Sequence, residues 1–173
     1  NNEGILFLVL AALVITIGVL NPVFFSVSTL FSILRGAIVP MVLALAVLII
    51  MISGGIDVSF VAIAIFAGYT SVVIAQSGGS DPGLFVVIAI SIFFGLVLGA
   101  FNGFVISLFR LPTLIVSLGT QSLFKGILLA YVGSEYIANL PPSMDEVATT
   151  NIVSIPQEQG VANLHVLVLP VIL

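Results

Sequence analysis

The sequence predicts an all-α fold, a polytopic bundle of helices that cross a membrane several times. Three observations favour it: 61% of the 173 residues are hydrophobic, only 6% are charged, and the mean hydropathy is +1.42. Soluble domains carry roughly 25% charged residues, and three basic plus seven acidic residues cannot cover the surface that a chain of this length exposes to water. Apolar runs recur throughout, so we expect a single transmembrane domain over residues 1–173.

The apolar runs give the expected helices in chain order. The first covers residues 4–20 and ends before Asn21-Pro22, because the residue before a proline is biased out of the helical region. A connection is expected over residues 23–32. The later helices are expected at residues 37–52, 58–75, 83–108, 113–132 and 164–173, the last cut short by the end of the sequence. Residues 37–75 form either two thin spans or one broken, partly re-entrant element.

The charged residues predict an orientation. Residues 133–163 form the one sizeable polar stretch and contain four acidic residues and no basic one, whereas Arg110 lies at the opposite end of the neighbouring apolar runs. The positive-inside rule therefore places Arg110 in the cytoplasm, the 133–163 loop outside the cytoplasm, and the N-terminus inside. Arg35 then falls on the outer side, against the rule. Either it pairs with a carboxylate, or the division of residues 37–75 is wrong.

The composition also excludes several kinds of chemistry. Without cysteine the chain has no disulfide and no thiolate metal site. With a single histidine, His165, and scattered carboxylates, it assembles neither a metal-ligand cluster nor a Ser/His/Asp set. We therefore expect no catalytic residues, no metal and no cofactor in this chain. The net charge of −4 comes mostly from one loop, so it indicates no nucleic-acid partner.

The segment Ser53–Ser59 (SGGIDVS) stands between two apolar runs. Gly54 and Gly55 are suited to end one helix, and Asp57 or Ser59 can cap the first amide groups of the next, where water is scarce. A broken helix that lines a cavity is a usual way for a membrane transporter to present polar backbone to a solute. The competing interpretation is a tight cytoplasmic turn with a capping aspartate, and the sequence leaves both open.

The run 83–108 carries small residues at strict intervals of four, which gives one face of that helix a smooth surface. The members of this small-residue stripe are Ser91, Gly95, Gly99, Gly103 and Ser107. Such a stripe lets another helix approach closely, so we interpret it as a helix-packing face rather than the wall of a conduit. Asn102 lies beside the stripe, and an amide at that depth needs a partner. It makes either a helix-to-helix hydrogen bond or a contact to a solute.

The run 113–132 has one polar face. Its members are Thr113, Ser117, Thr120, Gln121 and Lys125, at spacings that place them on one side of a helix. Lys125 lies well inside the apolar run, and a buried ammonium usually faces a cavity or a carboxylate. Its side chain could instead extend to the membrane surface. The candidate pathway residues are thus Gly54, Gly55, Asp57, Ser59, Asn102, Gln121 and Lys125.

Three segments carry a specific combined pattern: residues 21–35 (NPVFFSVSTLFSILR), 52–59 (ISGGIDVS) and 99–126 (GAFNGFVISLFRLPTLIVSLGTQSLFKG). Together they resemble the permease subunit of bacterial ABC importers for monosaccharides, of the ribose, xylose and arabinose type. One departure is Phe60-Val61, where the family usually has Val-Gly, which leaves less room for close backbone approach.

The resemblance implies that this chain is the N-terminal half of a permease of about ten helices in the bacterial inner membrane. It implies a second permease subunit, identical or closely related, two subunits that bind ATP and Mg²⁺, and an extracytoplasmic sugar-binding protein. The transported molecule would be a simple sugar. Alternatives are a permease for nucleosides, branched-chain amino acids or a sugar-like signal, half of an ion-coupled secondary transporter, or a membrane scaffold without transport.

Overall fold

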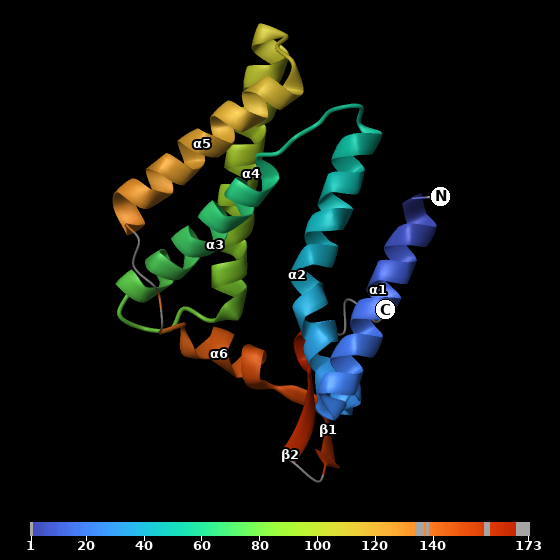
Figure 1. Cartoon of the computed structure of the whole chain (residues 1–173). Helices are drawn as coiled ribbons and strands as arrows, with labels where there is room; N and C mark the ends of the chain where they lie inside the picture. Colours follow the sequence, from blue (N-terminus) through green and yellow to red (C-terminus); the bar gives the residue numbers. More distant parts are fainter. Residues whose placement is uncertain (1, 134–136, 138, 158–159, 169–173) are drawn as a thin grey trace. The chain divides into compact units, whose positions relative to one another are not determined.

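A computed structural model describes residues 2–133, 137, 139–157 and 160–168 (Figure 1). Contacts divide the chain into two compact units: a terminal unit, Asn1–Ile38 with Thr150–Leu173, and a central unit, Val39–Thr149. The elements in chain order are α1 (Asn2–Leu20), η1 (Pro22–Phe25), α2 (Val27–Ile52), α3 (Phe60–Ser77), α4 (Leu84–Phe109), α5 (Thr113–Val132), α6 (Pro142–Thr149), β1 (Asn151–Gln157), β2 (Gly160–His165) and η2 (Val166–Val168).

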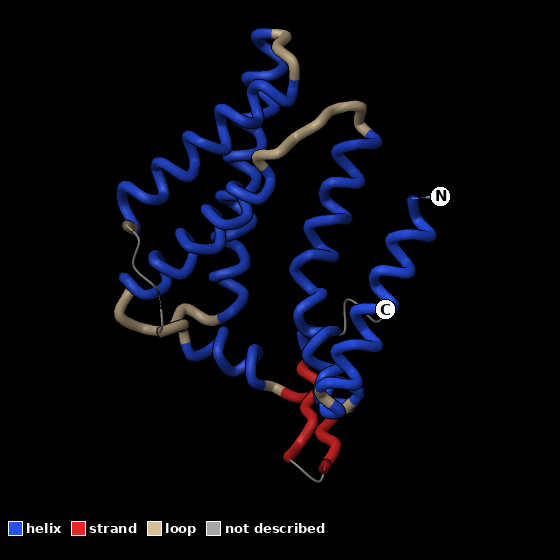
Figure 2. Tube along the Cα trace, in the orientation of Figure 1, coloured by secondary structure: helices blue, strands red, loops and turns tan. Residues whose placement is uncertain are grey.

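The helices α1 to α5 are each long and apolar enough to cross a membrane. They contain between 18 and 26 residues, and about 20 apolar residues span a bilayer core. The predicted polytopic helical fold is confirmed, with one two-stranded sheet added among the described residues. Residues 37–75, for which the sequence left two interpretations, contain the end of α2, an extended segment and α3 as separate elements (Figure 2).

The core of the central unit is where α3 packs against α4 and α5. Ala62 and Phe66 of α3 are buried together with Phe124 of α5, and Phe94 of α4 packs against them. The rings of Phe66 and Phe124 meet edge to face at 6.4 Å between centroids, a favoured aromatic geometry. These apolar contacts place α3 between its two neighbours, which fixes where its first residues lie.

The three core helices alternate in direction, so their connections fall at two opposite ends of the central unit. The break end carries the segment between α2 and α3 and the Arg110 turn between α4 and α5. The α6 end carries the connection between α3 and α4, where the Asp81 carboxylate accepts hydrogen bonds from the Ser143 amide (2.6 Å) and hydroxyl (2.8 Å). These two bonds attach the first turn of α6 to the bundle.

In the terminal unit, α2 begins ten residues earlier than the sequence prediction of residue 37. The expected connection over residues 23–32 was therefore wrong beyond Ser26. Ser26 has an extended backbone, and its hydroxyl accepts a hydrogen bond from the Thr29 amide at 3.2 Å. This is the arrangement of a helix N-cap. The true connection is short, and the ring of Phe25 packs directly over Gly18 of α1.

The polar stretch 133–163 is more structured than the predicted loop. It contains α6, β1 and the first part of β2. The two strands, β1 and β2, pair as an antiparallel hairpin with Ser154 opposite Asn163. The helix expected at residues 164–173 was wrong for its first five residues, which form the end of β2 and the short η2. Residues 169–173 lie outside the described residues. The sequence could not distinguish a strand from the start of a helix here, because a short apolar run fits both equally well.

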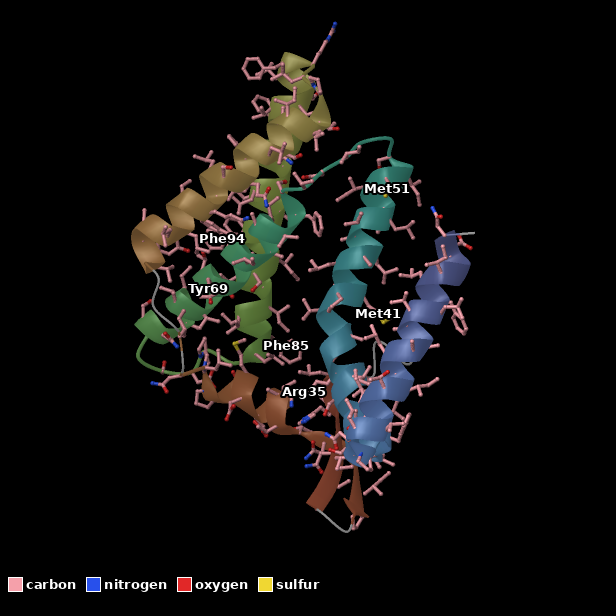
Figure 3. The ribbon with its side chains drawn as sticks, viewed as in Figure 1. Arg35, Met41, Met51, Tyr69, Phe85 and Phe94 are labelled. Atoms are coloured by element: carbon pink, nitrogen blue, oxygen red, sulfur yellow. The ribbon has the colours of Figure 1, made fainter. Side chains whose placement is uncertain are left out.

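Among the described residues, Arg35 is bonded to His165. The Arg35 guanidinium donates from Nη1 to His165 Nε2 at 2.9 Å, which ties α2 to β2 inside the terminal unit (Arg35 is labelled in Figure 3). Because the donor is a guanidinium, His165 Nε2 is the accepting nitrogen. Glu135 and Glu158 lie outside the described residues, so a carboxylate partner for Arg35 stays a prediction, as does the predicted orientation of the chain.

Candidate functional site

The candidate site begins at the break between α2 and α3. Gly54 has φ of +81°, a left-handed conformation that residues with a Cβ adopt at a cost, and its amide closes the end of α2 on the Met51 carbonyl. At Gly55 an added Cβ would lie 3.4 Å from Thr113 Cγ2 of α5. One glycine is thus needed for the turn, whereas a Cβ at the next would make ordinary van der Waals contact with α5.

Thr113, the first residue of α5, holds the extended segment in place. Its hydroxyl oxygen accepts a hydrogen bond from the Ile56 amide at 3.1 Å. This bond supplies a partner for a backbone N–H that belongs to no helix. The break and the α4–α5 turn are consequently joined at the same end of the bundle.

Asp57 organises the start of α3. Its Oδ1 atom accepts two hydrogen bonds from Ser59, one from the backbone amide and one from the hydroxyl, both at 2.6 Å. Ser59 has 0% exposure and makes no capping bond with its own side chain. Of the two residues that could cap α3, Asp57 therefore accepts the amide bond.

Asn102 of α4 joins this junction to α5. Its Nδ2 group donates to Asp57 Oδ2 at 3.0 Å and to Ser59 Oγ at 2.9 Å. Its Oδ1 atom accepts from the Thr120 hydroxyl at 3.0 Å. The amide is 2% exposed, both of its N–H groups are used, and its oxygen is bonded. We call these four residues, Asp57, Ser59, Asn102 and Thr120, the break network.

The break network lies below the end of the bundle rather than at its surface. Asn102 is seven residues before Phe109, the end of α4, and Thr120 is seven residues after Thr113. At 1.5 Å per residue this is a depth of about 10 Å. Figure 1 shows α3 beginning part of the way along α4. Extended backbone therefore enters the depth of the bundle, and a saturated set of hydrogen bonds holds it there.

The structure brings together five of the seven predicted pathway residues. Gly54, Gly55, Asp57, Ser59 and Asn102 form or adjoin the break. The other two do not join it: Gln121 is half-buried on α5, and Lys125 is exposed one turn further along. Of the two interpretations of Asn102, the helix-to-helix hydrogen bond is the one observed. A substrate-pathway role for any of the seven stays a prediction.

Two residues of the site, Thr113 and Thr120, were absent from that set. Both lie on the polar face of α5, seven residues apart and hence on one side of the helix. That spacing was the available signal. The spacing could not identify the hydrogen-bond partner of either hydroxyl, because a periodic polar face does not show which residue elsewhere in the chain each hydroxyl contacts.

The small-residue stripe of α4 is only partly in contact. Ser91 donates its hydroxyl hydrogen to Ser71 of α3 at 2.8 Å. At Gly95, Gly99 and Gly103, a Cβ added to the backbone would meet nothing within 4 Å. The packing role of this stripe stays a prediction, because the described part of the chain does not place a helix against these glycines. No group of three metal-binding side chains occurs among the described residues either.

The fold and the break together define a polytopic membrane protein whose helices are interrupted at a buried polar junction. Residues 29–173 match the model of the family described as "branched-chain amino acid transport system / permease component". The match covers most of the chain, and the chain belongs to this permease family. It is accordingly a multi-pass inner-membrane protein, as the five candidate spans indicate.

Curated relatives agree with this family. The chain is 28% identical over 155 residues to proteins named "Autoinducer 2 import system permease protein LsrC" from Yersinia pseudotuberculosis serotype O:3 (strain YPIII) and from Yersinia pestis (strain Pestoides F). Each alignment covers 90% of this chain and 43% of the relative, so the chain spans less than half the length of these relatives. No solved structure matches it significantly.

Proposed function

We propose that this chain is part of the membrane-spanning permease subunit of an ATP-driven importer that receives its solute from an extracytoplasmic binding protein. Membership of the permease family supports this, as do relatives named for an import system. The sequence pattern around the break, which resembles permeases of monosaccharide importers, supports it independently. The chain would perform no chemistry on the solute.

The single observation that carries the proposal is the break network. Extended backbone from Gly55 to Val58 lies beside α5, and Asp57 and Asn102 fix it between the helices. Interrupted helices that line a cavity are how transporters offer polar backbone to a solute at membrane depth. Because Asp57 and Asn102 are already bonded to each other, they act as positioning residues that set the shape of the pathway.

The solute we propose is a simple sugar or a sugar-like molecule. The named function of the relatives, import of autoinducer 2, supports a small polar solute of this kind. The description of the family favours a second candidate, a branched-chain amino acid. The ligand retained by the cognate binding protein distinguishes the two, since a sugar-binding protein and an amino-acid-binding protein present different polar groups.

The partners follow from the same proposal. A second permease subunit, identical or closely related, would complete the pathway, and two cytoplasmic subunits would bind ATP and Mg²⁺ and carry out hydrolysis. An ion-coupled transporter would need neither ATP-binding subunit. Uptake that persists after those subunits are removed would therefore contradict the proposal and favour the ion-coupled class.

The test uses the complete importer reconstituted in lipid vesicles, with Asp57→Ala compared against Ser122→Ala. Ser122 is an exposed residue of α5, and among the described residues its hydroxyl bonds only to the Leu118 carbonyl of its own helix. We expect Asp57→Ala to abolish most uptake and its coupling to ATP hydrolysis, and Ser122→Ala to leave both unchanged. Uptake and coupled hydrolysis that survive Asp57→Ala in a correctly assembled complex would show that the break does not serve transport.

A further inference from the structure

A second polar feature of the central unit lies apart from the break network. A groove of about 360 Å³ runs between α3 and α5, and its polar side chains include Tyr69 and Lys125. Its walls are otherwise mostly apolar, formed by residues such as Ile65 and Leu128. Figure 3 labels Tyr69 on α3. Among the described residues neither side chain has a hydrogen-bond or ion-pair partner.

Lys125 cannot easily bring its charge to either membrane surface. It lies seven residues before Val132, the end of α5, which at 1.5 Å per residue is about 10 Å. The other end of the helix is further away, at about 18 Å. Side chains on a helix tilt toward its N-terminus, so the four-carbon stem of Lys125 leans away from the nearer end. A cation so placed needs water or an anion in the groove.

The groups in the groove are suited to an oxyanion. An ammonium donates hydrogen bonds and accepts none, and a tyrosine hydroxyl can donate one more. Apolar walls weaken the screening of the ammonium, which strengthens its attraction for a negative group. The volume is sufficient for a group the size of a carboxylate or sulfonate together with water.

We propose that the α3–α5 groove is a water-accessible binding site for a small oxyanion, with Lys125 supplying the charge and Tyr69 a second hydrogen bond. The site rests on the proposed function in one respect, because a permease pathway provides the aqueous access. Binding there requires no contact with the break network, and the site would favour a solute, or a part of one, that carries negative charge.

The test measures the charge preference of the groove directly in the complete permease. The present chain has no cysteine, so Tyr69→Cys introduces a thiol that can be compared with the unsubstituted protein. Its rates of reaction with an anionic sulfonatoethyl methanethiosulfonate and a cationic trimethylammonioethyl methanethiosulfonate are measured with Lys125 present and in Lys125→Met. We expect the anionic reagent to react faster, and the anionic-to-cationic ratio to fall about tenfold in Lys125→Met.

Two further positions make the result decisive. Ile65→Cys, in the same groove, should show the same change of ratio if Tyr69→Cys does not fold. Leu123→Cys lies two residues from Lys125, on the opposite face of α5, and should not react with either water-soluble reagent. Groove thiols that fail to react, or a ratio that Lys125→Met leaves unchanged, would overturn the proposal.

The labelling test of the groove and the uptake test of the proposed function can fail independently of each other. Charge-selective labelling in a complex that fails to import would contradict the transport proposal alone. Import by a complex whose groove thiols do not react would contradict the oxyanion site alone.

Discussion

Two aspartates at opposite ends of the central unit do the same structural task in different surroundings. Asp57, at the break end, accepts three hydrogen bonds: two from Ser59 and one from Asn102. Asp81, at the α6 end, also accepts three: from the Gly83 amide and from the amide and hydroxyl of Ser143. Each carboxyl group holds an irregular segment against the start of a helix.

The difference between them is burial. The partners of Asp57 include Ser59 and Asn102, which are 0% and 2% exposed, whereas Asp81 and its bonds are exposed to solvent. A buried polar group that loses its partner bears the full cost of desolvation, but an exposed group can bond to water instead. The same pattern of bonds should therefore be essential at the break end and dispensable at the α6 end.

The largest effect is expected for Asn102→Ala. It removes one partner each from Asp57, Ser59 and Thr120 without giving water easy access, so we expect a loss of about 3 kcal/mol of stability. Thermal unfolding of the complete permease in detergent measures this as a midpoint several degrees lower. Ser122→Ala is the matched control, because in the described part of the chain the Ser122 hydroxyl bonds only within its own helix. Equal midpoints for the two variants would show that the break network does not stabilise the fold.

A smaller effect is expected for Gly54→Ala. The φ of +81° at this position imposes a cost of about 1–2 kcal/mol on a residue with a Cβ, although an added Cβ would meet no neighbour within 4 Å. Gly68→Ala is the comparison, since Gly68 lies inside α3 with equal space. There alanine should be neutral or stabilising, because it is the better helix former. The two variants should shift the unfolding midpoint in opposite directions; a common direction would refute the conformational argument.

The smallest effect is expected at Asp81, and it depends on pH. Hydrogen bonds, first from the Gly83 amide and then from the Ser143 hydroxyl, hold the pKa of Asp81 below its ordinary value. Because the pKa is lower in the folded chain, the stabilisation is complete above the unfolded value of about 3.9 and is lost as pH falls through the lower folded value. The protection of the first-turn amides of α6 from hydrogen exchange, expressed relative to their intrinsic exchange rates at each pH, should therefore fall on acidification.

The control for this pH effect is Asp81→Asn. An asparagine keeps one acceptor oxygen but does not titrate in this range, so protection of the Ser143 amide should be weaker at neutral pH and independent of pH. An acid-induced loss of protection that persists in Asp81→Asn would assign the effect to another group.

The sequence predicted the elements of the central unit better than their partners. The ends of α3, α4 and α5 lie within two residues of the expected ranges, because long apolar runs bounded by Gly, Pro and Asp have few alternative structures. Local spacing predicted either Asp57 or Ser59 as a cap. The bond of Asp57 to Asn102, 45 residues away, was not predictable, since single-helix periodicity carries no information about which helices meet.

The terminal unit was predicted less well, for a physical reason that differs between its two parts. The start of α2 depends on one hydroxyl, that of Ser26, which stands among apolar residues and resembles an ordinary loop serine. The β1–β2 hairpin is short, and its second strand ends in an apolar run that fits a helix start. In both cases a few local bonds decided between structures of similar intrinsic preference.

The central claim, that the Asp57–Asn102 pair positions the break for transport, is tested most directly by exchanging the two side chains. Asp57→Asn turns an N–H group toward the N–H groups of Asn102, and Asn102→Asp places two carboxyl groups together, so each single variant should lose most uptake in the reconstituted importer. The double variant restores an amide facing a carboxyl group and should recover a substantial part of that uptake. A double variant no more active than the single variants, or single variants with normal uptake, would contradict the claim.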